Sequence, residues 1–250
     1  MDTRILFLIK LGEYENLKKL QQGKLYFKNL KYYSELERTT GDSSMGDSLE
    51  GLYRTTQGSF ELYDKKTGKL IYTANNITNV IKYETVYKMP VFCMIGIKNT
   101  DLPFEKIDDS FIGCNINLFN IIENMSEKSY WGSALFIIDN NEFIKRVITA
   151  CEKQGISCRC KPVQYTDMNI NYKDRIEDID NNKFNIAFWK DNSYSKQYEY
   201  RIILEGLKVE DSYTLDIGDI SDITILKKSD EIKEYLDKTL TIKMRINDKV

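Results

Sequence analysis

Three polar side chains alternate with two tyrosines near the end of the chain, in the segment Gln197-Tyr198-Glu199-Tyr200-Arg201. Because the side chains of a β-strand alternate between two faces, Gln197, Glu199 and Arg201 would share one face of a strand. Such a face can line a cleft, in which the Glu199 carboxylate and the Arg201 guanidinium would tune one another electrostatically. An amphipathic strand that turns its polar face to solvent explains the same pattern.

A polar, glycine-rich stretch at residues 39–51 (TTGDSSMGDSLEG) concentrates acidic side chains, including Asp47 and Glu50. These carboxylates can orient a polar ligand or hold Arg38 or Arg54. Together with a divalent metal ion they would suit a nuclease. The alternative is a solvated turn in which Asp and Ser side chains cap the backbone.

The two tryptophans of the chain lie in the segments YWGS (130–133) and FWK (188–190). Aromatic rings beside small or charged residues can form stacking walls for a base or a nicotinamide, and Trp131 is our candidate for such a wall. The alternative is that both segments belong to the hydrophobic core or its edge.

Histidine is absent from all 250 residues. Ser-His-Asp and Cys-His catalysis, HExxH zinc sites and His-ligated haem are therefore excluded. No glycine-rich loop of the dinucleotide-binding or P-loop type supports a Rossmann or nucleotide-triphosphate site. Any catalysis must use carboxylates, Lys, Tyr, Cys, Ser or the backbone, and we predict no metal site.

The cysteines and the apolar runs indicate the compartment. The five cysteines are scattered and odd in number, which does not suit a disulfide framework. The Cys158-Arg159-Cys160 segment lacks the second pair of ligands that a zinc site needs. We therefore expect reduced thiols with a structural role. The apolar run near the start is too short for a signal peptide, and no stretch approaches the roughly 18 apolar residues of a membrane span. We expect a cytoplasmic protein without a membrane partner. The formal charge of −2 argues against a strong electrostatic nucleic-acid binder.

Strands and helices that would position these residues follow from the apolar spacing. Strands are predicted at 4–10, 24–30, 80–87, 90–98, 133–139, 157–166 and 197–206, with antiparallel strands around a turn at 64–68. Helices are predicted at 13–22, 30–38, 115–125, 141–155, 173–189 and 229–240. The strands come in runs rather than in strict βαβ alternation, which favours a single α+β domain over residues 1–250, with a largely antiparallel central sheet flanked by short helices.

Three of these segments together resemble a broad bacterial and prophage family of unknown function. They are the opening strand–helix–Gly–LYF unit, the GDSLEG loop (46–51) and the late YEYRI strand (198–202). In length and general character the chain is similar to AbiGi-type abortive phage-infection proteins. The resemblance implies a role in phage–host or toxin–antitoxin conflict, with a partner protein encoded in the same operon.

The opening unit also resembles the start of ADP-ribosyltransferase-like folds, in which a late strand carries a catalytic glutamate. This resemblance implies that NAD is the substrate and that Glu199 is the catalytic residue. The Glu199 carboxylate would hydrogen-bond the nicotinamide ribose and stabilise an oxocarbenium-like transition state, while Gln197 would position the acceptor.

The same resemblance implies the residues that bind NAD. Lys10 stands in the first strand, where the family has Arg or His as its NAD-gripping residue. Tyr26, Arg201 and Trp131 would complete the NAD-binding side. The replacement at Lys10 leaves two hypotheses open: an enzyme that transfers ADP-ribose to a protein or nucleic acid, and a non-catalytic inhibitor or antitoxin that binds a partner. A metal-dependent nuclease built on Asp47 and Glu50 is the third.

Overall fold

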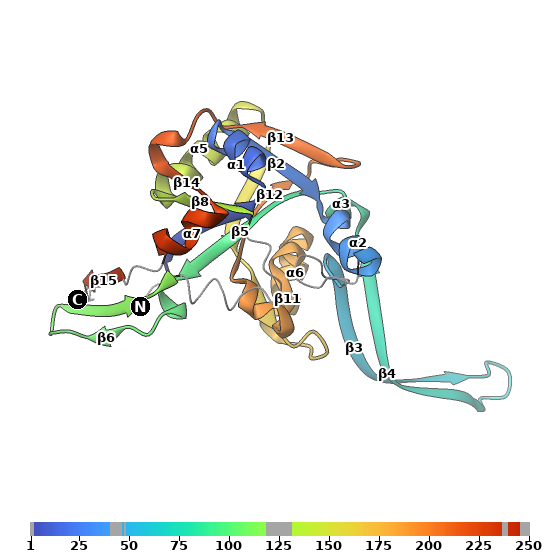
Figure 1. Ribbon diagram of the computed structural model, residues 1–250. Coiled ribbons are helices and arrows are strands. Elements are labelled where there is room, and N and C mark those ends of the chain that lie inside the picture. Colours follow the sequence, from blue (N-terminus) through green and yellow to red (C-terminus); the bar gives the residue numbers. More distant parts are fainter. Residues whose placement is uncertain (1–2, 41–46, 48, 119–131, 237–239, 246–250) are drawn as a thin grey trace.

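A central antiparallel sheet organises the molecule (Figure 1). The structure is a computed structural model that describes residues 3–40, 47, 49–118, 132–236 and 240–245. Six strands form a continuous path in the order β13 (Ser212–Asp216), β2 (Lys24–Asn29), β5 (Pro90–Lys98), β1 (Ile5–Gly12), β8 (Ser133–Ile137) and β14 (Thr224–Lys228). Two more strands, β12 (Glu199–Glu205) and β9 (Ser157–Pro162), continue from β5. The predicted α+β class with a large antiparallel sheet is confirmed.

The long strand β5 is the branching point of this sheet. Ile95 of β5 pairs with Ile9 of β1 on one side and with Glu199 of β12 on the other. Towards its beginning, β5 pairs with the end of β2. Strands from both ends of the sequence therefore meet at the middle of β5.

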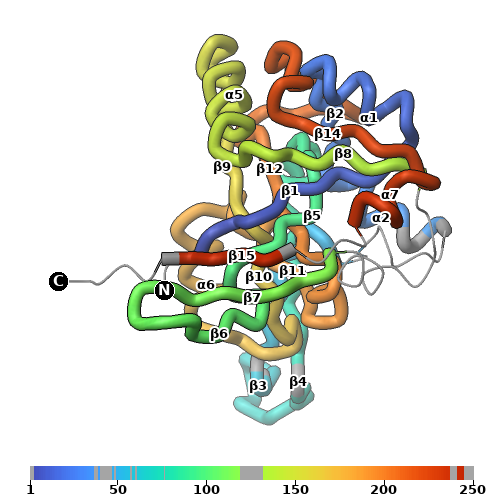
Figure 2. Tube along the Cα trace, turned by 60° about the vertical axis from the view of Figure 1, so that its left-hand side comes forward, coloured from blue at the N-terminus to red at the C-terminus, as the bar shows by residue number. Residues whose placement is uncertain are grey.

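Short helices cover both faces of the sheet (Figures 1 and 2). They are the α-helices α1 (Tyr14–Gln21), α2 (Leu30–Thr40), α3 (Glu84–Tyr87), α5 (Asn140–Lys153), α6 (Lys173–Asn181) and α7 (Ser229–Leu236), with the 3₁₀ helices η1 (Asn99–Asp101), η2 (Lys183–Phe188), η3 (Asn192–Gln197) and η4 (Ser221–Ile223). None of the helices in the described part of the chain is long and apolar enough to span a membrane.

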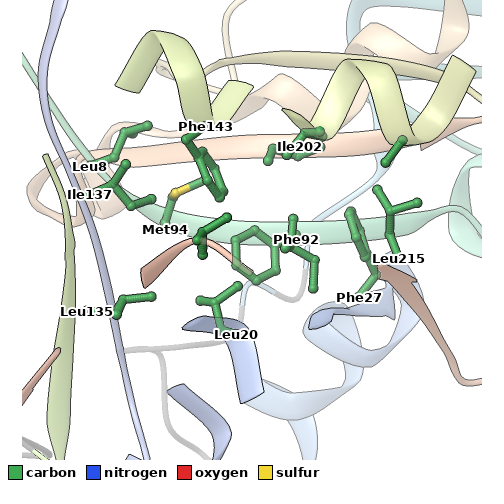
Figure 3. Close-up of a cluster of buried hydrophobic side chains, with 14 of the residues drawn as sticks. Leu8, Leu20, Phe27, Phe92, Met94, Leu135, Ile137, Phe143, Ile202 and Leu215 are labelled. Carbon is green, nitrogen blue, oxygen red and sulfur yellow. The ribbon is translucent and has the colours of Figure 1, made fainter. Parts of the chain in front are cut away.

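The main hydrophobic core lies between the sheet and the helices α1 and α5 (Figure 3). Phe143 of α5 is fully buried there, next to Leu8 of β1 and Met94 of β5. A second apolar cluster on the other side of β5 and β12 is built from α2, α3, α6 and η2. The centre of β12 is therefore covered on both faces, and burial of apolar surface on both faces stabilises it.

Three small sheets surround this body. One contains β6 (Glu105–Lys106), β7 (Phe111–Ile116) and β15 (Leu240–Arg245). A parallel pair joins β10 (Gln164–Thr166) to β11 (Trp189–Asp191). The third is a long hairpin of β3 (Leu52–Tyr63) and β4 (Leu70–Lys82) that projects from the body and turns at the predicted residues 64–68 (Figure 1).

Several predicted element boundaries are wrong, and the reason is tertiary packing. The strand expected at 80–87 ends at Lys82 and is followed by α3, which buries Val86 and Tyr87. The helix expected at 115–125 is β7 as far as Ile116, and its residues 119–125 lie outside the described part. The helix expected at 173–189 divides into α6 and η2, and Trp189 begins β11.

Candidate functional site

Strand β12 turns two charged side chains into the interior. Tyr200 and Ile202 point into the main core, so Glu199 and Arg201 occupy the opposite face. The shared face of Glu199 and Arg201 agrees with the sequence pattern. The interpretation of this face as solvent-exposed is wrong: Glu199 is 9% exposed and Arg201 is 1% exposed.

Glu199, Arg201, Lys190 of β11 and Glu50 together form what we call the buried charge cluster. Glu199 Oε1 accepts a hydrogen bond from Arg201 Nε at 2.6 Å, and Glu199 Oε2 accepts one from Arg201 Nη2 at 3.0 Å. Lys190 Nζ donates to Glu199 Oε2 at 3.1 Å. Arg201 also donates to the carbonyl oxygen of Ala187 in η2. Glu199 is therefore held by two cations.

Glu50 reaches the cluster from the predicted acidic loop. The Asp47 carbonyl oxygen accepts a bond from Glu50 N at 2.9 Å, and Asp47 Oδ1 accepts one from Leu49 N at 2.8 Å. This turn directs the Glu50 carboxylate towards Arg201, and the two side chains form an ion pair. The other carboxylate oxygen, Glu50 Oε2, lies 3.9 Å from Lys190 Nζ. Both Glu50 oxygens are held by these ion pairs and accept no well-directed hydrogen bond among the described residues.

The acidic loop thus differs from its predicted roles. Asp47 and Glu50 are each 2% exposed, so this part of the loop is not a solvated turn. Glu50 pairs with Arg201 rather than with the predicted Arg54, and the Arg38 side chain lies outside the described part. Residue types show the acidic character of a loop, but the cation that it meets depends on the fold.

Electrostatics inside the cluster favour the charged forms of Glu199, Arg201 and Lys190. Burial by itself would raise the pKa of Glu199, but Arg201 and Lys190 outweigh burial and lower it. Burial would lower the pKa of Arg201, yet the two carboxylates raise it well above the usual range, and they also raise the pKa of Lys190. For Glu50 burial is the larger effect, and its pKa is raised. Two acids and two bases give a neutral set, which is how a protein interior tolerates buried charges.

A cavity of about 230 Å³ lies against Glu199. Tyr165 and Tyr198 contribute aromatic walls, and Lys98 and Lys196 contribute positive charge. The Glu199 backbone N–H donates to Tyr165 Oη at 2.9 Å, which ties this wall to β12.

Tyr198 has a backbone conformation that is rare for its residue type. Its φ of +46° is in the left-handed region, which non-glycine residues seldom adopt. Its carbonyl oxygen accepts a 2.7 Å bond from Gly96 N of β5. Conformations of this kind cluster at functional sites, because the surrounding structure must hold them in place.

Gln197 and Lys10 both lie close to the cluster. Gln197 ends η3 instead of lying on the strand, and its Oε1 accepts a 2.9 Å bond from Lys190 Nζ. Lys10 Nζ donates to the Cys93 carbonyl oxygen at 2.5 Å and lies 5.0 Å from the centre of the Phe92 ring. Burial lowers the pKa of Lys10, while Cys93 and Glu199 counteract this effect. Lys10 is within electrostatic range of Glu199, but it does not line the described cavity.

Tyr26, which was assigned to NAD binding, is not brought to the cluster. Tyr26 is 52% exposed on β2, where it pairs with Thr214 of β13 and its ring lies 5.7 Å from Lys28 Nζ. Trp131 lies outside the described residues. Tyr165 and Tyr198 line the cavity beside Glu199 instead.

Lys190 was not among the predicted site residues. Phe188 and Trp189 are buried core residues, as the alternative reading proposed, and Trp189 Nε1 donates to Asp178 Oδ2 at 2.9 Å. Lys190 follows them directly and is 2% exposed. The available signal was that Lys190 directly follows the apolar run 186–189. A lysine is rarely buried unless it is paired, so a lysine in a buried segment indicates a partner carboxylate.

Chemically, the site offers an ionised carboxylate on a residue that lines a small cavity. No three Cys, Asp or Glu side chains in the described ranges are grouped to hold a metal ion, so the nuclease hypothesis gains no support there. No protein-family model, curated protein or solved structure matches this chain in the comparisons. Function must therefore be inferred from the chemistry of the site.

Proposed function

We propose that this protein transfers ADP-ribose from NAD to a macromolecule and acts in phage–host or toxin–antitoxin conflict. One observation supports the proposal above the others. Glu199 and Gln197, the two residues that the transferase resemblance assigns to catalysis, lie at one site, where Glu199 borders a cavity and is kept as a carboxylate by Arg201 and Lys190.

The reaction would break the bond between C1′ of the ribose and the nicotinamide nitrogen. The electron pair of that bond leaves with nicotinamide, and positive charge develops on the ribose. The acceptor nucleophile then forms a bond to C1′ and releases its proton to solvent, so the products are the ADP-ribosylated acceptor, nicotinamide and a proton. A fixed negative charge next to the ribose stabilises this transition state. Because the pKa of Glu199 is lowered, Glu199 supplies that charge throughout the physiological pH range.

The cavity fits one end of NAD. Pockets that enclose a drug-sized ligand measure roughly 300–1,000 Å³, and this cavity measures about 230 Å³, so it would take the nicotinamide ribose while the remainder lies outside. Tyr165 and Tyr198 would flank the ring. Lys196 would attract the diphosphate, whereas the Lys98 ammonium is paired with Asp101, another lining residue, at 3.4 Å.

Incubation of the protein with labelled NAD and cell extract tests this proposal. We expect the wild type to label a macromolecule and Glu199→Gln to give only background label. Glu205→Gln is the matched control, because Glu205 lies on the same strand but pairs with Arg159, at 2.8 Å, away from the cavity. Equal, background-level label from the wild type and Glu199→Gln would reject the enzymatic proposal.

A second variant separates a catalytic defect from a folding defect. Lys196 is exposed at the cavity, so Lys196→Glu should leave the circular dichroism spectrum unchanged and raise the KM for NAD. Glu199→Gln should instead lower the kcat of the protein that remains folded. Loss of label in Glu199→Gln together with loss of the folded spectrum would point to a structural role for Glu199.

A non-catalytic inhibitor or antitoxin is the second candidate, and one observation favours it. The Glu199 charge is matched by Arg201 and Lys190, and Lys10 donates to a backbone carbonyl group rather than into the cavity. A stoichiometric partner recovered from host lysate by both the wild type and Glu199→Gln, without label transfer, would support this candidate. Absence of any partner would count against it.

A further inference from the structure

The projecting hairpin has one strand whose outer edge is open. β4 pairs with β3 along its inner side, and its outer side pairs with no other strand in the described residues. The hairpin extends away from the body (Figure 1). At about 3.4 Å per residue, β4 offers an edge roughly 40 Å long. A two-stranded ribbon of this kind is marginally stable in water without further packing.

The outer side of β3, by contrast, is already in use near the body. Thr56 N donates to Asn171 Oδ1 at 2.9 Å, and Asn171 Nδ2 donates back to the Thr56 carbonyl oxygen. Arg175 Nη1 donates to the carbonyl oxygen of Arg54 at 3.0 Å. These contacts occupy backbone groups of β3 that another strand would need, so β4 is the edge that can accept one.

The β4 edge also lacks the usual protection against pairing. Sheet edges are commonly guarded by charged side chains or proline. The segment 70–81 (LIYTANNITNVI) contains neither, although Lys69 precedes it and Lys82 follows it. An uncharged edge of this length is suited to pairing with a further strand.

Four of the five exposed large apolar side chains on β4 are arranged symmetrically. Ile71 is 59% exposed, Tyr72 56%, Val80 52% and Ile81 45%, and the fifth, Leu70, is 51% exposed at the start of the strand. Ile71 and Ile81 are equally far from position 76, and so are Tyr72 and Val80. If a second β4 lay antiparallel to the first and centred on position 76, Ile71 would face Ile81 of the second copy, and Tyr72 would face Val80.

We propose that β4 pairs with β4 of a second copy of this chain about a twofold axis at position 76. The product is a four-stranded ribbon with one body at each end. Such an interface is self-complementary, as the symmetry of a homodimer requires. It pairs these four apolar side chains between the two copies and completes the backbone hydrogen bonds of the open edge. This proposal is independent of the chemistry at Glu199.

Sedimentation velocity of the full chain over a concentration series tests the dimer. The wild type should sediment as a dimer of the 29.3 kDa chain. Ile71→Lys disrupts the pair between Ile71 and Ile81 of the other copy, and this pair occurs twice in each dimer. Such cross-strand pairs contribute up to about 1 kcal/mol each. The dissociation constant of the dimer should therefore rise by about tenfold or more. Leu62→Lys is the control, because Leu62 is exposed on the same hairpin but belongs to β3.

A charge-pair rescue tests the register. Ile71→Lys combined with Ile81→Glu places opposite charges face to face between copies and should restore the dimer. Within one chain these positions are ten residues apart on a strand, roughly 33 Å, so they cannot pair with each other. Ile71→Lys combined with Val80→Glu places the charges on opposite faces of the ribbon and should not restore it.

Three outcomes would overturn the proposal. The first is a wild type that stays monomeric at every concentration. The second is a dimer that Ile71→Lys weakens no more than Leu62→Lys does. The third is equal rescue by both double variants. If the chain stays monomeric but takes up a strand from a different protein, the edge serves another partner and the homodimer is also refuted.

Discussion

Removal of the Glu199 charge should destabilise the folded protein strongly. Three contacts of 2.6, 3.0 and 3.1 Å join this carboxylate to Arg201 and Lys190. Glu199→Gln preserves the shape of the side chain but leaves two buried cations against Glu50. Breaking a buried ion pair from one side costs about 3–5 kcal/mol, because the remaining charge stays desolvated. For a protein with a total stability of about 5–15 kcal/mol, this is a large fraction.

A compensating substitution tests whether charge balance is the cause. Glu199→Gln combined with Lys190→Met removes one charge of each sign and leaves the Glu50–Arg201 pair. The stability that the double variant loses should be smaller, by at least about 1 kcal/mol, than the sum of the losses of the two single variants, because the effects of residues in contact are coupled. Asp216→Asn, which breaks an exposed pair with Lys24, should cost less than about 1 kcal/mol.

The effect of Glu199→Gln should depend on pH in a defined direction. The pKa of Glu199 is lowered in the folded state, so the folded protein binds this proton less readily than the unfolded chain does. The advantage of the wild type over Glu199→Gln is therefore complete above the ordinary pKa of about 4.5 and shrinks as the pH falls below it.

Urea unfolding measures these differences, monitored by circular dichroism at pH 7 and at a series of lower pH values. A lower midpoint with an unchanged m-value would report a loss of stability rather than a change in the denatured state. The reasoning is refuted if Glu199→Gln costs less than about 1 kcal/mol at pH 7, or if the two single losses simply add in the double variant.

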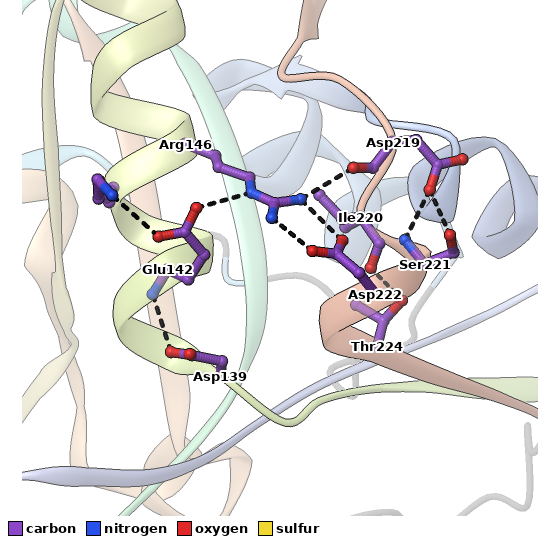
Figure 4. Close-up of polar contacts among 9 residues, drawn as sticks. Asp139, Glu142, Arg146, Asp219, Ile220, Ser221, Asp222 and Thr224 are labelled. Atoms are coloured by element: carbon purple, nitrogen blue, oxygen red, sulfur yellow. Dashed lines mark hydrogen bonds and ion pairs between the residues drawn. The ribbon is translucent and has the colours of Figure 1, made fainter.

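Three further predictions concern other parts of the fold. Gly51 has a φ of +70°, and an added Cβ would lie 2.6 Å from Leu30 Cδ2. Gly51→Ala should therefore lower the free energy of unfolding in urea by about 1–3 kcal/mol. Gly58→Ala is the control and should cost much less, because the space around Gly58 is open. Phe143→Ala should cost about 3–5 kcal/mol by the same measurement, because it empties the centre of the main core. The Arg146 side chain joins Glu142 of α5 to Asp222 and to the Asp219 carbonyl oxygen (Figure 4). Arg146→Ala should therefore lower the Tm measured by calorimetry more than Lys145→Ala does. Equal Tm values for the two variants would contradict this.

Local spacing was enough to predict much of the framework. Alternation of apolar and polar residues places Glu199 and Arg201 on one face of β12, because the period of a strand depends only on neighbouring residues. Gly23 and Gly155 end their helices with positive φ values, as expected for a residue without a Cβ. The absence of histidine excludes whole classes of mechanism without any structure.

Partners across the sequence could not be predicted in this way. Glu50 and Arg201 are far apart along the chain, and each fits its own segment without reference to the other. From the sequence, Glu50 was therefore expected to orient a polar ligand, to hold Arg38 or Arg54, or to lie in a solvated turn, and Lys190 was not expected at the site. The family resemblance placed the exposed Tyr26 beside NAD. Only the folded sheet brings β11, β12 and the turn before β3 together.

The sequence by itself determined that Glu199 and Arg201 point the same way from one strand and which chemistry is excluded. The tertiary structure decided that the polar face of β12 is buried, that four charges balance one another there, and that a cavity lies beside Glu199. The physical reason is that backbone periodicity is local. Burial and charge pairing depend on distant segments that meet only when the chain has folded.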